Sequence, residues 1–339
     1  MTTIYVAQPH TELKLQSRQL QVFQQQKFCF AVPINRVNQL VILGQQPWTQ
    51  KAANLALSLH IPVLYFEPDG QCVEYSNPST FEPAKYLKYQ IERSRHAEFT
   101  HNIAESLVRA KLHNSRVLLL QLSNTSHLTD VPSTSTRCAP ATVQQVLNLL
   151  QRLLDDLPMA GSLAVLQSYA DTATSLYRAA LNRFLPDEFR LQNMGINPIH
   201  RLTNLGVALL SQRLQTVLQS AGLDLDIATL HLDSITRPPL VCDFLTEFQG
   251  AIVDSLVMHL LNSGQIVPDD FIWFHQGIFL RPAALELFIE AWDEKLSAIV
   301  HHLYAGEVSY HHCLEIQAQE YIAFLLEDQE YYRPMLLKL

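Results

Sequence analysis

The stretch LHLDSITRPPLVCDFLTEF, residues 230–248, predicts how the helical part of this chain is organised. It carries His231 ahead of a Pro-Pro turn, and then Asp243 and Glu247 four residues apart. Proline is well tolerated in the first turn of a helix, because the N–H groups there lack helical partners anyway. We therefore expect a helix over residues 240–261 that carries both carboxylates on one face, with His231 close to its start.

A histidine and a carboxylate that converge in this way suit two kinds of site. They can bind a divalent cation, or the carboxylate can orient the imidazole as a base. The alternative is an ordinary hydrogen-bonded surface pair, because paired titratable groups indicate function only statistically. Features elsewhere in the chain are needed to choose between these interpretations.

The composition indicates a globular protein. The chain has 339 residues, of which 48% are hydrophobic and 17% charged, enough for two domains with their own cores. No apolar run reaches the length of a membrane span, and the first residues lack the pattern of a signal peptide. We expect a cytoplasmic location and no membrane partner.

Cysteine and charge usage narrow the function classes. The five cysteines are scattered and form no CxxC, which argues against zinc ribbons and redox motifs. The net charge of −8 argues against broad, non-specific affinity for nucleic acid, although it leaves room for one basic face.

Residues 1–80 look strand-rich, and the predicted fold class is α+β. One helix is expected over residues 49–60, and Pro68-Asp69-Gly70 has the composition of a hairpin turn. The expected strands cover residues 3–7, 12–16, 20–23, 28–32, 39–43, 61–66 and 71–75. The segment reads as a small domain for dimerisation or packing.

Residues 81–339 predict a larger, all-helical domain. A long or broken helix over 82–111 is the densest basic region, and it includes aromatic residues, as strand-tracking nucleic-acid surfaces do. The competing interpretation is a solvated helix face. A Ser-, Thr- and Pro-rich segment, residues 123–140, suggests a flexible insertion. Further helices are expected over 141–157, 161–184, 200–221, 240–262, 282–303 and 309–327.

Several segments in the same order resemble one family, the CRISPR-associated integrases called Cas1. They are VNQLVILGQQPWTQKAANLALSLHIPVLYFEPDG, AKLHNSRVLLL, NPIHRLTNLGVALLSQRLQTVLQSAGLDLDIATLHLD, RPPLVCDFLTEFQGAIVDSLVMHLLNSG and YIAFLLEDQEYYRP. The resemblance covers nearly the whole chain. It implies a strand-rich N-terminal domain for dimerisation, followed by a helical catalytic domain.

In this family a Glu, a His and an Asp hold a divalent metal. The resemblance places the His at His231 and the Asp at Asp243, and it gives Glu247 a role behind the metal ligands or in the structure. Asp254 also matches a family Asp, and its expected role is on the helix surface or in a salt bridge. The Glu position falls on Ala170, with Tyr177 anchoring the match.

An alanine side chain cannot ligate a metal, and two explanations fit it. Either the natural protein has lost the ligand, or a Glu has been deliberately replaced. Asp171 is a poor substitute, because one residue of helix rotates a side chain by about 100°. A Mg²⁺ or Mn²⁺ site without this carboxylate should bind metal more weakly.

Three functions remain open. The resemblance implies a metal-dependent DNA endonuclease and strand transferase that inserts short prespacer DNA into a CRISPR repeat, as a homodimer with the small protein Cas2. A second possibility is a catalytically inactive member that acts as a DNA-binding scaffold. A third is a metal-independent helical interaction module. The candidate phosphate contacts are Lys85, Lys88, Arg93, Arg95, Lys111 and Arg116.

Overall fold

The computed structural model separates the chain into two compact units, each with its own core. The structure describes residues 2–6, 11–43, 54–56, 58–59, 61, 63–66, 72–76, 84–125, 142–190, 198–232, 234, 237–274 and 277–338. One unit comprises residues 1–82, 192–208 and 266–290, and the other comprises residues 83–191, 209–265 and 291–339. Among the described residues, no helix has both the length and the apolar content to cross a membrane.

The first unit contains two small sheets. The four-stranded sheet has the order β1-β5-β6-β7, in which the first three strands are parallel and β7 is antiparallel to β6. Its strands are β1 (Thr2–Val6), β5 (Val37–Leu43), β6 (Val63–Phe66) and β7 (Cys72–Ser76). A second sheet is the antiparallel meander of β2 (Thr11–Gln16), β3 (Gln19–Gln24) and β4 (Lys27–Pro33), followed by η1 (Ile34–Arg36).

Alternating apolar residues explain why these strands form. Ile4 and Val6 in β1, Leu20 in β3, and Leu40 and Ile42 in β5 are all buried in one apolar cluster, as strands with one face on a core require. The same unit contains the hairpin of β8 (Phe271–Phe274) and β9 (Gly277–Leu280), preceded by η5 (Pro268–Asp270).

The second unit is mostly helical. Its helices are α2 (Leu87–Arg93), α3 (Ala97–Thr125), α4 (Val143–Asp156), α5 (Leu163–Leu181), α6 (Asp187–Arg190), α8 (Pro239–Gln249), α9 (Ser255–Asn262) and α11 (Tyr310–Leu325), with the short turns η2 (Leu157–Met159) and η3 (Asn182–Phe184). Helices α7 (Pro198–Ser220) and α10 (Pro282–Ser297) contribute residues to both units. An antiparallel hairpin, β10 (Ile299–His302) and β11 (Gly306–Ser309), precedes α11.

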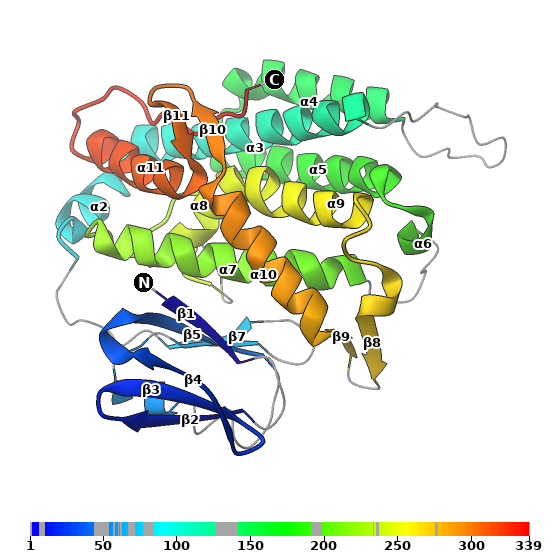
Figure 1. Ribbon diagram of the computed structural model, residues 1–339. Helices are drawn as coiled ribbons and strands as arrows, with labels where there is room; N and C mark the ends of the chain where they lie inside the picture. The colour runs from blue at the N-terminus through cyan, green and yellow to red at the C-terminus, as the bar shows by residue number, and fades with distance from the viewer. Residues whose placement is uncertain are drawn as a thin grey trace. The chain divides into compact units, whose positions relative to one another are not determined.

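Helix α3 lies at the centre of this unit and packs against α4, α5 and α8 (Figure 1). Ile103, Leu107, Leu112 and Val117 are buried along its length. Helices α4 and α5 begin at residues whose hydroxyls accept a hydrogen bond from the first turn, Thr142 and Ser162 respectively. A central helix covered by others in this way fixes the positions of α5 and α8.

Helix α8 begins at the second residue of the Pro-Pro turn, as the sequence predicts. It continues through one wide π-turn, η4 (Gly250–Asp254), directly into α9. The turn inserts an extra residue into an otherwise regular helix.

The predicted fold class is confirmed, with a strand-rich N-terminal region followed by a mostly helical part. The helix predicted over residues 282–303 is wrong at its end, because it stops at Ser297 and Ile299–His302 forms β10. The second part is therefore not all-helical. The division into domains at 1–80 and 81–339 stays a prediction.

Two further predictions fall partly or wholly outside the described residues. Residues 123–125 of the predicted insertion 123–140 form the end of α3, and the remainder of that segment lies outside. The predicted turn at residues 68–70 also lies outside, although β6 and β7 on either side of it pair as an antiparallel hairpin.

Candidate active site

The segment 229–231 is held in place by a single carboxylate, that of Asp243 on α8. The Asp243 side chain is 1% exposed, so its oxygens need partners within the protein. Oδ2 accepts the backbone N–H of Thr229 at 2.8 Å and its hydroxyl at 3.2 Å. Oδ1 accepts the backbone N–H of His231 at 3.0 Å, and the Leu230 N–H lies 3.3 Å from both oxygens. One carboxylate thus fixes three consecutive backbone N–H groups.

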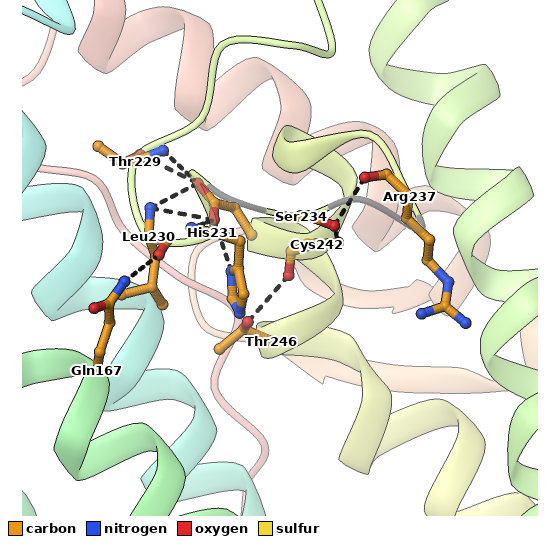
Figure 2. A network of polar contacts seen from close by, with 9 residues as sticks. Gln167, Thr229, Leu230, His231, Ser234, Arg237, Cys242 and Thr246 are labelled. Atoms are coloured by element: carbon orange, nitrogen blue, oxygen red, sulfur yellow. Dashed lines mark hydrogen bonds and ion pairs between the residues drawn. The ribbon is translucent and has the colours of Figure 1, made fainter.

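The His231 ring is bound to the same carboxylate. Its Nδ1 lies 2.9 Å from Asp243 Oδ1 (Figure 2). A carboxylate oxygen accepts, so we assign the donated proton to Nδ1, which leaves Nε2 as the other ring nitrogen. The His231 side chain is 39% exposed. The structure therefore brings His231 and Asp243 together as predicted, and Nε2 is the ring nitrogen that the carboxylate does not contact.

Helix α5 contacts the opposite side of the same segment. The Gln167 side chain donates to the Leu230 carbonyl at 2.8 Å. Ala170 follows three residues later, roughly 4.5 Å along the helix axis and on a neighbouring part of the same face. It is buried, at 7% exposure. The nearness of position 170 to His231 itself stays a prediction, and Ala170 has no side-chain atom to bind a ligand.

The residues present do not fit a divalent cation. Hard cations need several oxygen ligands, and here Ala170 supplies none. Asp243 already receives hydrogen bonds on both oxygens, which leaves His231 Nε2 as the available donor atom of the three predicted ligand positions. No group of three or more His, Cys, Asp or Glu side chains in the described part of the chain is arranged to hold a metal ion.

Glu247 lies one turn after Asp243 and has a different environment. It is fully buried, and it accepts hydrogen bonds from the Tyr332 hydroxyl at 2.8 Å and from the Met335 backbone N–H. Desolvation raises the pKa of Glu247 to about 8, although these hydrogen bonds oppose the shift. Asn114 donates to the carbonyls of Glu247 and Met335 at 3.0 and 3.1 Å. Through its side-chain contacts Glu247 holds the C-terminal tail, residues 332–337, against α8.

Asp254 belongs to a further buried cluster. The Tyr177 hydroxyl of α5 donates to Asp254 Oδ2 at 3.0 Å. Desolvation raises the pKa of Asp254 to about 6, against the opposing effects of Tyr177, Gln249, Arg178 and Lys111. Burial also lowers the pKa of Lys111, which lies near Asp171 and Asp254. The helix-surface role expected for Asp254 is wrong, because the side chain is 7% exposed and has the Tyr177 hydroxyl as a buried partner.

The predicted phosphate contacts divide into exposed and internally paired side chains. Lys85, Lys88 and Arg95 are exposed. Arg93 forms an ion pair with Glu327, and its guanidinium lies 4.8 Å from the Phe99 ring. Lys111 and Arg116 are half-buried within α3, so they are less available to a large ligand.

Sequence reasoning missed the residues that build the segment around His231. Thr229 binds Asp243 through its N–H and hydroxyl, and Gln167 binds the Leu230 carbonyl from α5. The Ser234 hydroxyl donates to the Arg237 carbonyl and accepts the weak S–H donor of Cys242 at 3.2 Å (Figure 2). A threonine two residues before a candidate histidine is too common a pattern to predict such a contact.

Comparison with known proteins now defines the family. A family model described as CRISPR associated protein Cas1 matches residues 4–294. The chain therefore belongs to the Cas1 family.

Curated relatives support this assignment. The CRISPR-associated endonuclease Cas1 3 of Thermus thermophilus is 24% identical over 313 residues, which cover 90% of this chain and 88% of that protein. A Cas4/Cas1 fusion of Rhodospirillum rubrum is 24% identical over 314 residues, which cover 88% of this chain and 51% of the fusion. The chain thus spans about half the length of the fusion relative and most of the free-standing one.

Solved structures share the fold. A chain of a Cas6-RT-Cas1–Cas2 complex aligns over all of this chain and 36% of its own length, with a TM-score of 0.80 and 22% identity. A casposase bound to integration product aligns over 97% of this chain and 92% of its own, with a TM-score of 0.77 and 19% identity. At these identities the likeness establishes the fold.

Proposed function

We propose that this chain serves CRISPR adaptation as a DNA-binding Cas1 subunit that does not itself carry out strand transfer. Family membership supports the role in adaptation, since the curated relatives are named CRISPR-associated endonucleases. The observation that argues against catalysis by this chain is Ala170. The side chain at the third ligand position has no donor atom, and no described acidic cluster replaces it.

An exposed basic segment supports DNA binding. Lys85 lies two residues before α2, Lys88 lies in its first turn and Arg95 follows its end, and all three side chains are exposed. The backbone there is fixed, because the Tyr86 N–H donates to the Gly222 carbonyl at 3.0 Å. Lysine and arginine side chains on a fixed backbone bind phosphates without reading sequence.

The proposed partners are those that the names of structurally similar proteins mention. One aligned structure is titled as a complex that includes Cas2, and another as bound to integration product. We infer that this chain forms a homodimer that binds Cas2 and contacts prespacer and repeat DNA in the cytoplasm.

An integration assay tests the lack of strand transfer. The full chain, with a Cas2 partner, is mixed with a fluorescent prespacer duplex, supercoiled plasmid carrying a repeat, and Mn²⁺ or Mg²⁺. We expect no labelled plasmid above the level of His231→Ala. Labelled plasmid that depends on His231 would overturn the proposal.

A binding assay tests the DNA-binding half of the proposal. Fluorescence anisotropy with a short duplex should show affinity tighter than about 10⁻⁴ M, the loose end of non-specific binding. Lys85→Ala and Lys88→Ala should each weaken binding and lower the salt slope by about 1. The matched control is Arg152→Ala, which removes an equally exposed charge from α4. Equal losses in the control would contradict the assignment of this face.

The second candidate is the active integrase that the relatives' names imply. The retained His231–Asp243 pair favours it. In that case Mg²⁺ or Mn²⁺ would be the cofactor, and the integration assay above would give the opposite result.

A further inference from the structure

We infer that Asp243 is a positioning residue for His231 and the segment 229–231, and not a metal ligand, so that this site lacks two acidic ligands instead of one. The inference deepens the proposed function and rests on it. It starts from the capacity of a carboxylate, whose two oxygens offer about four lone-pair positions for donors or cations.

The donors around Asp243 fill that capacity. Five reach its oxygens within 3.3 Å: the backbone N–H groups of Thr229, Leu230 and His231, the Thr229 hydroxyl and the His231 ring. A cation on either oxygen would have to displace at least one of them. The backbone N–H groups of Thr229 and Leu230 are buried with those residues, so a displaced group would lose its partner without gaining water.

The arrangement instead resembles a metal-binding histidine, His231, with a carboxylate, Asp243, that orients its ring. A histidine whose Nδ1–H is held by a carboxylate has a fixed tautomer and ring orientation, with Nε2 free to bind. Asp243 does this and also fixes the backbone on which the ring is mounted. Gln167 fixes the same segment from α5 through the Leu230 carbonyl. Together these contacts fix the position of the His231 Nε2 atom.

Restoring a glutamate at position 170 should have different effects under the two roles of Asp243. If Asp243 were a ligand, Ala170→Glu would complete a site of three protein ligands. If Asp243 only positions His231, the variant gains one carboxylate beside one imidazole. Two donors of this kind form a weak site for a hard cation, which takes six or more oxygen-type ligands.

Mn²⁺ binding to the full chain tests this directly, with free Mn²⁺ followed by electron paramagnetic resonance. Ala170→Gln is the matched control, because it adds a side chain of the same size without the charge. We expect Ala170→Glu to bind Mn²⁺ less than about tenfold more tightly than this control. A gain of a hundredfold or more, abolished by adding Asp243→Asn, would overturn the inference. Urea unfolding shows whether each variant folds, and Ala170→Asp replaces Ala170→Glu if the longer side chain is not accommodated.

A spectroscopic measurement gives a second readout that does not depend on position 170. Nitrogen-15 spectra of histidine in the wild-type chain should show His231 protonated at Nδ1, and saturating Mg²⁺ should leave that proton in place. Asp243→Asn should shift the ring toward the other tautomer. Loss of the Nδ1 proton signal on adding Mg²⁺ would contradict the inference.

The two proposals fail separately. Strand transfer by the wild-type chain would overturn the proposed function. Strand transfer by Ala170→Glu alone, with an inactive wild type, would leave the proposed function standing and overturn the assignment of Asp243.

Discussion

Asp243 and Glu247 lie one turn apart on α8 and are equally buried, but they contact different segments of the chain. Asp243 is held by backbone N–H groups and by a half-exposed imidazole. Glu247 is enclosed by the tail, with the Tyr332 hydroxyl and the Met335 N–H as donors, and its pKa is raised to about 8. This difference shows that the role of a buried carboxylate depends on the donors around it more than on its position on a helix face.

The largest effect is expected for Glu247→Ala. Two buried donors lose their acceptor, at about 1–3 kcal/mol each, and a cavity is left. The free energy of unfolding should fall by roughly 3–5 kcal/mol in urea titrations. Glu247→Gln keeps the volume and one acceptor, so it should cost clearly less. Equal losses for the two variants would show that charge and not packing dominates here.

The next largest effect is expected in the pH dependence of stability, through Glu247. The pKa of Glu247 is higher in the folded protein than in the unfolded chain, so the folded state binds the extra proton between about pH 4.5 and 8. The free energy of unfolding should fall as pH rises through this window, by up to about 1.4 kcal/mol per unit of pH. Asp254, with its pKa raised to about 6, adds to the fall in the lower half.

A control identifies the group responsible for the fall. Burial raises the pKa of Tyr332 well above its usual range and that of Cys313 to about 12, so both neighbours of Glu247 stay neutral throughout. Unfolding of Glu247→Gln should therefore lose the upper part of the pH dependence. An unchanged profile in this variant would assign the effect elsewhere.

Asp243→Ala should have a smaller effect on stability than Glu247→Ala. Its donors include the His231 ring, which is 39% exposed and can bind water once the carboxylate is gone. We expect a loss of about 2–3 kcal/mol in urea unfolding, because the N–H groups of Thr229 and Leu230 remain buried. A loss as large as that of Glu247→Ala would contradict the comparison.

The smallest effect is expected for His231→Ala. The ring is 39% exposed, and removing it leaves the backbone contacts of Asp243 in place. The free energy of unfolding should change by about 1 kcal/mol or less. A much larger loss would mean that the ring is part of the core instead of a group held for binding.

The sequence predicts local structure here better than it predicts contacts between distant segments. The Pro-Pro turn sets the start of α8, and the short apolar strands are placed to within a few residues. The pairing of His231 with Asp243 is predictable because only twelve residues separate them. Glu247 meets Met335 across 88 residues, and nothing in the local pattern of either indicates that contact.

One wrong prediction and one ion pair that the sequence does not indicate have the same physical origin. The run from Ile299 to His302 has no helix-breaking residue, yet it pairs with β11 to form a hairpin. Arg93 belongs to a basic segment, yet its charge is matched by Glu327, 234 residues away. In both cases tertiary partners override the local preference.

The wide turn at Gly250–Asp254 has a consequence for how α8 and α9 are phased. Seven residues of regular helix amount to almost two complete revolutions, which would stack Asp254 above Glu247 and aim both at the tail. The added residue rotates the residues after it back by roughly a quarter of a turn about the helix axis. Asp254 therefore contacts Tyr177 of α5 instead. Deleting one residue from this turn should swing the apolar stripe of α9 out of alignment with the core, even though no side chain at either carboxylate has changed.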